Sequence, residues 1–178
     1  ALGIVLLPSL SKAIKQSDHK TTNNIQNRSI EFSLLISLPS AIGLFILAEP
    51  IIYILFERGA FLKDDTFYTA KVLSYFALGL PAYIIIKVLV SCFFAREDTK
   101  TPLYISIVSV ISNIVLSLLL IESMREMGIA VATAISAWIN ALLLYFFLAI
   151  RNYMKFDSLL IKNSIKILLC SAILFVGV

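Results

Sequence analysis

The sequence predicts an all-α fold, a polytopic transmembrane helix bundle. Hydrophobic residues occupy 60% of the 178 positions, charged residues only 15%, and the mean hydropathy is +0.94. Soluble domains are nearer to about 45 to 50% apolar. The apolar residues gather in stretches of roughly 20, the length that crosses a bilayer as a helix. Because lipid solvates apolar side chains on every face of a helix, such a chain needs no polar exterior.

Apolar stretches define the elements in order. The spanning stretches are Phe32–Phe56, Phe67–Ala95, Pro102–Ile121 and Ile129–Ile150. A fifth begins near Leu160 and is still apolar at Val178, and Ala1–Leu10 has the character of the last turns of a preceding helix. We therefore expect a piece truncated at both ends. Residues 1–150 would hold the end of one helix and four transmembrane helices, and residues 151–178 a connection and the start of an additional transmembrane helix.

The connections between these stretches carry most of the charge. They are Ser11–Ser29, Glu57–Asp65, Arg96–Thr101, Glu122–Gly128 and Arg151–Lys162. Because successive spans alternate sides, the first, third and fifth connections share a face; they carry four, two and three Lys or Arg residues, against two and one in the others. Cation excess marks the cytoplasmic side. In the third connection Thr99 or Thr101 can cap the next helix, with Pro102 at its first position, and Arg28 is spaced to pair with Glu31.

The sequence shows no signature of catalysis or metal binding. His19 is the single histidine, and Cys92 and Cys170 lie in apolar stretches without metal-ligand spacing. The carboxylate pairs fall in turns, where a solvated role is favoured over acid–base chemistry. We therefore predict no catalytic residue, no metal and no cofactor, and thus not an enzyme. The net charge of +4 is that expected near anionic lipid headgroups, so nucleic acid is not an expected partner.

Helix-breaking and small residues within the spans suggest where the bundle could move. Pro39 and Pro81 lie mid-span and each removes a backbone hydrogen bond, so both are candidate hinges, with a static packing kink as the alternative. Gly43 and Gly79 thin the same two stretches, which allows neighbouring helices to approach closely.

Three polar residues inside the spans are candidates for lining a cavity or joining helices. Lys87 is the deepest charge, eight residues from Ala95 or about 12 Å along a helix. Its ammonium either lines a wet cavity or snorkels toward the headgroups. Asn113 and Asn140 lie in the middle of consecutive spans. Hydrogen bonding between helices is the usual reason for such an amide, and substrate contact is the alternative.

Four segments match the pattern of one family in the same order. They are VLLPSLSKAI at 5–14, LPSAIGLFILAEPIIYILFERGAF at 38–61, YFALGLPAYIIIKVLVSCFFAREDTKTP at 75–102 and GIAVATAISAWINALLLY at 128–145. In these the chain resembles the MurJ (MviN) lipid II flippases, members of the multidrug/oligosaccharidyl-lipid/polysaccharide exporter superfamily. The turn with Asp98, Lys100, Thr101 and Pro102, with Lys87 upstream, is the most specific part of the resemblance.

The resemblance implies a multi-pass protein of the bacterial inner membrane that works by alternating access. In the family two lobes enclose a cationic cavity for the pyrophosphate and sugars of lipid II. This chain would be most of the second, C-terminal lobe of a MurJ/MATE-like transporter, with lipid II, membrane lipids and the missing N-terminal lobe as partners. The family's cavity arginines would lie upstream of Ala1. The alternatives are a polysaccharide-lipid or drug exporter of the superfamily, a membrane glycosyltransferase, and a purely structural half-protein.

Overall fold

A computed structural model describes residues 2–16, 18–155 and 157–177. Within these ranges the chain forms seven helices: α1 (Leu2–Lys15), α2 (His19–Ile46), α3 (Ala48–Phe56), α4 (Lys63–Phe94), α5 (Lys100–Met124), α6 (Glu126–Ile150) and α7 (Ser158–Gly177). Positions 1 and 178, where the first and last predicted apolar stretches begin and stop, lie outside the described residues. So do positions 17 and 156, which fall in two of the predicted connections.

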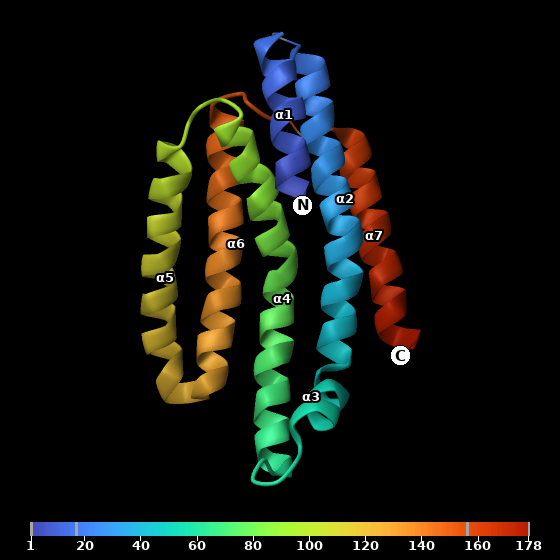
Figure 1. Ribbon diagram of the computed structural model, residues 1–178, viewed down its shortest axis with the longest axis vertical. Coiled ribbons are helices and arrows are strands. Elements are labelled where there is room, and N and C mark those ends of the chain that lie inside the picture. The colour runs from blue at the N-terminus through green and yellow to red at the C-terminus, as the bar shows by residue number, and fades with distance from the viewer. Residues whose placement is uncertain (1, 17, 156, 178) are drawn as a thin grey trace.

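The long helices lie side by side in one layer, in the order α5, α6, α4, α2 and α7 (Figure 1). The shorter α1 packs against α2 and α4 at one end of the layer, and α3 packs against α4 at the other. The connections from α1 to α2, from α4 to α5 and from α6 to α7 lie at the first end, which we call the cation-rich end (Figure 1). The predicted alternation of the connections is therefore confirmed, and the positive-inside rule predicts that the cation-rich end faces the cytoplasm.

Four helices among the described residues are long and apolar enough to cross a membrane: α2, α4, α5 and α6. Each overlaps one of the four spanning stretches predicted from hydropathy, so the polytopic all-α fold is confirmed. The helix α7 is not one of the four, and its role as the start of a further span stays a prediction.

The first predicted span is wrong in one respect, because Phe32–Phe56 is not a single helix. The helix α2 ends at Ile46, Leu47 takes a non-helical conformation, and α3 starts at Ala48. Pro50 has no N–H to give to the carbonyl four residues earlier, which favours a break at this point. Glu49 then lies exposed in the first turn of α3, where a carboxylate is favoured by the helix dipole.

The first predicted connection is also wrong in extent, because most of Ser11–Ser29 is helical. The helix α1 continues to Lys15, and α2 begins at His19. Hydropathy locates the edge of the lipid and not the end of a helix, which can continue into water where it is capped. Asp18 supplies such a cap, since its carboxylate accepts a hydrogen bond from the Thr21 N–H at 2.9 Å.

The cap of α5 differs from the prediction as well. Thr99 is at the cap position, but its side chain makes no capping hydrogen bond. Asp98 takes this role, because its carboxylate accepts from the backbone N–H of Thr101 at 3.1 Å and from the Thr101 hydroxyl at 2.7 Å. Pro102 is the third helical residue and not the first. The carboxylate of Asp98, one position before Thr99, therefore caps the start of α5.

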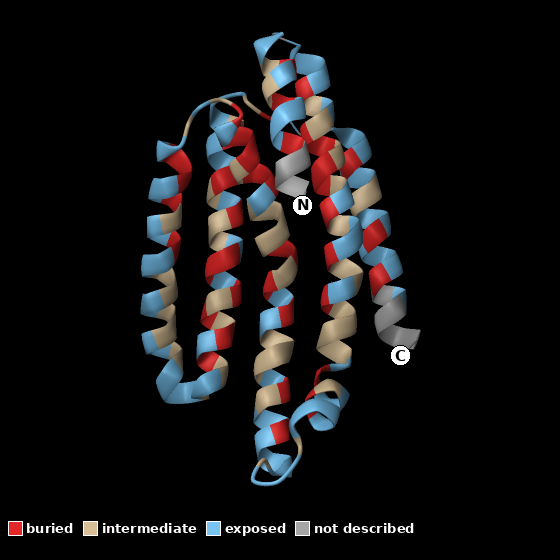
Figure 2. Cartoon of the chain, in the orientation of Figure 1, coloured by how far each residue is buried: buried red, intermediate tan, exposed pale blue. Residues whose placement is uncertain are grey.

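The buried core is concentrated at the cation-rich end (Figure 2). The buried side chains there come from every helix except α3 and from the chain after α6; they include Leu10, Leu89, Phe93, Leu144, Leu148 and Met154. The second cluster is small and joins α3 to α4 through Ala48, Ile52 and Ala70. Apolar burial thus fixes the helices mainly at one end of the layer.

Small residues allow close approach at one of the two predicted positions. A Cβ added to Gly79 would lie 3.3 Å from the Cα of Ala134, so α4 and α6 pack closely there and that prediction is confirmed. A Cβ on Gly43 would meet nothing within 4 Å, so the prediction is wrong for Gly43. The reason is that Gly43 is on a part of α2 that lies against open space.

Candidate functional site

The connection between α6 and α7 is held to α2 by a pair of amides. Asn23 accepts a hydrogen bond from the backbone N–H of Lys155 at 2.8 Å, and Asn27 donates to the Lys155 carbonyl at 2.9 Å. The two asparagines are four positions apart and therefore share one helical face. Together they satisfy both backbone polar groups of one residue that has no secondary structure of its own.

Arg96 holds the same connection to α4. Its guanidinium donates to the carbonyls of Cys92 and Tyr153, each at 2.8 Å, and stacks on the Tyr153 ring at 4.6 Å. The fully buried Gln26, with its amide oriented to match donors with acceptors, donates to the Tyr153 carbonyl at 3.0 Å and accepts from Arg96 at 3.1 Å. Burial lowers the pKa of Arg96, since its charge is partly removed from water.

A second arginine ties the end of α6 to the start of α5. Arg151 forms an ion pair with Asp98 and donates to the Thr101 hydroxyl at 3.0 Å. Burial raises the pKa of Asp98, but the hydrogen bonds from Thr101 and Arg151 outweigh it and leave the pKa below its ordinary value. Asp98 therefore serves both as helix cap and as the partner of Arg151.

The predicted pair of Arg28 and Glu31 is confirmed and belongs to a larger cluster. Arg28 contacts Glu31 on its own helix and also Asp157 at 3.2 Å, just before α7. Glu31 accepts in turn from Asn163 on α7. The local ion pair thus joins α2 to α7, a role that spacing along α2 alone does not reveal.

Lys87 lies on the exposed face of α4. Its carbonyl accepts from the Ser91 hydroxyl at 2.8 Å, but within the described part of the chain its ammonium forms no ion pair or hydrogen bond. Phe94 lies seven positions further on the same face and is also exposed. The ammonium therefore projects out of the layer and not into a seam between its helices.

Asn113 joins α5 to α6. It donates to the Thr133 hydroxyl at 3.4 Å and accepts from the Ser117 hydroxyl at 3.0 Å. One turn away, the Ser109 hydroxyl donates to the Ser136 carbonyl at 2.9 Å. These contacts support the interpretation of Asn113 as a contact between helices.

Asn140 differs from Asn113, although both are mid-span amides. Its side-chain oxygen is buried and has no hydrogen-bond partner among the described residues. Leaving such a group unpaired costs free energy. The structure does not bring Lys87, Asn113 and Asn140 together in one pocket; they lie on α4, α5 and α6.

The two prolines lie on helices that share an apolar cavity. This cavity, of about 510 Å³, is lined by Leu38, Ala41, Ile42, Phe45, Leu78, Pro81 and Trp138. Pro39 follows the lining residue Leu38, and Pro81 lines the cavity itself. The Trp138 indole donates to the Leu78 carbonyl at 3.1 Å, three residues before Pro81. The carbonyl that Pro81 leaves without its helical donor is that of Ala77, so this bond from α6 holds the neighbouring residue of α4.

Several of these contacts have no local signal in the sequence. Asn23, Asn27 and Gln26 form a polar face on α2, and this periodicity could have pointed to a partner. Arg96 and Trp138 carry no such pattern, since their partners are 57 and 60 positions away.

Comparison with known proteins covers the whole chain. The family profile described as "Lipid II flippase MurJ" matches residues 1–178. A probable lipid II flippase MurJ of Rickettsia prowazekii is 44% identical over 170 residues, which is 96% of this chain and 34% of that protein. The corresponding protein of Rhizobium tropici is 42% identical over 174 residues, 98% of this chain and 33% of that protein.

A solved structure titled "Lipid II flippase MurJ, inward closed conformation" is 32% identical and has a TM-score of 0.84. The match covers 99% of this chain and 36% of that one. The chain spans about a third of the length of the relatives it matches. Because the family profile covers every residue and the fold agrees, this chain belongs to the MurJ family.

Proposed function

We propose that this chain forms part of a lipid II flippase, which moves the lipid-linked peptidoglycan precursor from the cytoplasmic to the outer face of the membrane by alternating access. The observation that carries the proposal is the family match over all 178 residues. The agreement of the fold with a MurJ structure supports it. The family and the four spanning helices make the chain a multi-pass protein of the bacterial inner membrane.

Within such a flippase the chain would supply most of the C-terminal lobe. Residues 1–150 would contribute the end of one helix and four transmembrane helices, and residues 151–178 the cytoplasmic connection and the start of another. The single layer of helices supports this, because a layer exposes apolar side chains on both faces and suits the wall of a larger assembly. Its protein partner would be an N-terminal lobe of the same transporter.

Lys87 is the residue that we propose as a cation of the transport cavity. Its side chain is exposed and its ammonium unpaired within the described residues, and Lys87 lies seven residues, or about 10 Å, from the end of α4 at Phe94. A charge at that depth is favoured only beside water or a counter-charge. Pyrophosphate is an anion that an ammonium can bind as a point charge.

The test replaces Lys87 in the intact transporter. Lys87→Ala should lower lipid II export by roughly tenfold, the effect of losing one charge-assisted contact, and Lys87→Arg should retain part of it. Lys71→Ala is the matched control, because Lys71 is another exposed cation of α4, placed over the Phe67 ring at 4.0 Å. If Lys87→Ala complements fully at normal expression, the Lys87 ammonium reaches toward the headgroups and does not line the transport cavity.

We propose transport, and not catalysis, as the role of the chain. A membrane glycosyltransferase would need an acidic cluster in a sizeable loop, and the connections between described helices are short, such as 57–62 and 95–99. Depletion of the protein is the experiment that distinguishes a lipid II flippase from a polysaccharide-lipid or drug exporter of the same superfamily. Accumulation of lipid II on depletion supports the proposal, and its absence contradicts it.

A further inference from the structure

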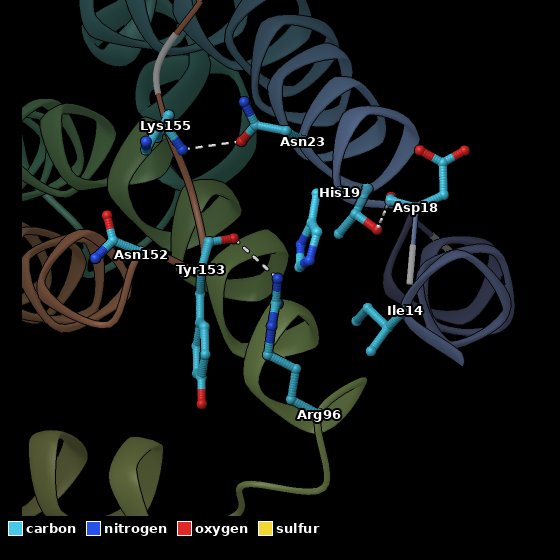
Figure 3. A pocket seen from close by; sticks show the side chains of 9 residues that line it. Ile14, Asp18, His19, Asn23, Arg96, Asn152, Tyr153 and Lys155 are labelled. Atoms are coloured by element: carbon cyan, nitrogen blue, oxygen red, sulfur yellow. Dashed lines mark hydrogen bonds between the residues drawn. The ribbon is translucent and has the colours of Figure 1, made fainter. Parts of the chain in front are cut away.

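A polar pocket of about 560 Å³ opens at the cation-rich end, between the α1–α2 hairpin and the connection from α6 to α7. Its lining comes from five parts of the chain: Ile14, Asp18, His19, Thr22, Asn23, Arg96, Asn152, Tyr153 and Lys155. Figure 3 shows the His19 ring and the Arg96 guanidinium directed into the same space, with the Asp18 carboxylate turned away from it. The transport proposal makes no use of this pocket.

The charge of Arg96 is not balanced by a carboxylate. At the same end of the layer Arg28 is paired with Glu31 and Asp157, and Arg151 is paired with Asp98. Arg96 is half-buried and donates only to neutral groups, the carbonyls of Cys92 and Tyr153 and the Gln26 amide. Among the described residues it forms no ion pair.

The other pocket groups add to this positive field. The Lys155 side chain is exposed, and its backbone, not its ammonium, is held by Asn23 and Asn27. The ammonium is therefore available to a ligand. The one carboxylate of the lining, Asp18, is already engaged as the cap of α2 through the Thr21 N–H at 2.9 Å.

We propose that this pocket binds the phosphate group of an anionic membrane lipid, with Lys155 and His19 contacting the phosphate and Arg96 supplying a fixed charge behind it. The position of the pocket favours a lipid source, because its lining residues Arg96 and Asn152 lie within two residues of the predicted span ends at Ala95 and Ile150. The positive-inside rule predicts that this is the cytoplasmic leaflet, where anionic lipids attract basic groups. The site is separate from Lys87, and its occupancy does not depend on which molecule is transported.

The test is a binding measurement on the intact transporter in nonionic detergent. Phosphatidylglycerol is titrated against phosphatidylcholine, and bound lipids are counted by native mass spectrometry. Wild-type protein should retain one phosphatidylglycerol in preference to phosphatidylcholine. Lys155→Gln should weaken this binding by about fivefold, the effect of one cation near an anionic headgroup. Arg96→Gln should weaken it by about tenfold, with unfolding measured alongside, because Arg96 also holds the Tyr153 carbonyl.

Lys100→Gln is the matched control, since Lys100 is an exposed cation at the same end and does not line the pocket. Equal loss in Lys155→Gln and Lys100→Gln, or no loss in either, would overturn the site. Inorganic phosphate is added in a second arm, with chloride at matched ionic strength. If phosphate displaces the lipid when the two are present at equal concentration and chloride does not, the pocket prefers free phosphate and the lipid assignment is wrong. Because lipid II export is not measured, failure here leaves the proposed function standing.

Discussion

The cation-rich end of this molecule and the middle of its helix layer are held together by different forces. At the cation-rich end, Arg96, Arg151, Asn23 and Asn27 bind connections to helices, above the larger buried cluster. In the middle, α2, α4 and α6 enclose an apolar cavity of about 510 Å³ beside Pro81. From this contrast we propose that the layer is anchored at one end and deforms in its middle, which is the arrangement that a hinge requires.

The largest expected effect comes from breaking the anchored end. Gln26→Ala removes an acceptor from the half-buried Arg96 and a donor from the Tyr153 carbonyl. We expect a loss of about 2–3 kcal/mol in the free energy of unfolding, because hydrogen bonds to charged groups are the strong ones. Thermal unfolding in detergent measures it. Asn24→Ala, an exposed amide of the same helix, is the control and should change stability by less than about 0.5 kcal/mol. Equal losses in the free energy of unfolding for Gln26→Ala and Asn24→Ala would contradict the role of Gln26 as an anchor.

The cap of α5 should contribute less, and its contribution should depend on pH. Asp98→Ala should cost about 1 kcal/mol, whereas Asp98→Asn retains a capping oxygen and loses only the charge. The pKa of Asp98 is below the ordinary 3.8 in the folded state, so its stabilisation is present above 3.8 and is lost as the pH falls through the lower folded value. Unfolding measured against pH should therefore show a smaller acid-dependent loss in Asp98→Asn than in wild type. Identical pH profiles would contradict the role of the charge.

The middle of the layer is tested by Pro81→Ala. We propose Pro81, with Pro39, as a hinge, supported by the cavity beside them and by the Trp138 bond to the Leu78 carbonyl. Alanine restores a backbone donor, so stability should change by less than about 1 kcal/mol while transport slows severalfold. Pro8→Ala is the control, since Pro8 is also inside a helix but is exposed in α1. Unchanged transport in Pro81→Ala would identify Pro81 as a static kink.

The smallest effect on stability is expected at Asn140. Asn140→Leu removes a buried oxygen that has no partner among the described residues, so the protein should be unchanged or slightly more stable. Asn113→Leu is the comparison and should cost about 0.6 kcal/mol, because Asn113 donates to Thr133. If Asn140→Leu is stable but transports poorly, the unpaired oxygen serves substrate or water. A clear loss of stability would show that Asn140 has a structural partner.

Prediction from the sequence succeeded where the cause is local. Hydropathy located four spans because solvation by lipid depends on composition along the chain. The pair of Arg28 and Glu31 followed from helical spacing. The same local reasoning was wrong at Leu47, where α2 ends, and at Asp98, which caps α5 in place of Thr99. Both errors concern helix ends, where a single hydrogen bond decides the boundary and hydropathy carries little information.

The candidate functional residues were predicted only as separate positions. Lys87, Asn113 and Asn140 stood out because burying a polar group in lipid costs free energy. That cost identifies the residue but gives no information on the direction of its side chain. Their surroundings differ, since Asn113 is paired between helices, the Asn140 oxygen is unpaired, and Lys87 faces outward. The polar pocket around Arg96 was not predicted at all, because its lining is drawn from segments more than 130 positions apart.

The sequence by itself determined that the chain crosses the membrane repeatedly, with its cations at alternate connections, since transfer of each segment into lipid depends on that segment alone. Tertiary structure decided which charges are balanced. Whether an arginine meets a carboxylate, a carbonyl or an empty pocket depends on how helices distant in sequence pack. For that reason Arg28 and Arg151 meet carboxylates, whereas Arg96, the same residue type, meets carbonyls beside a pocket.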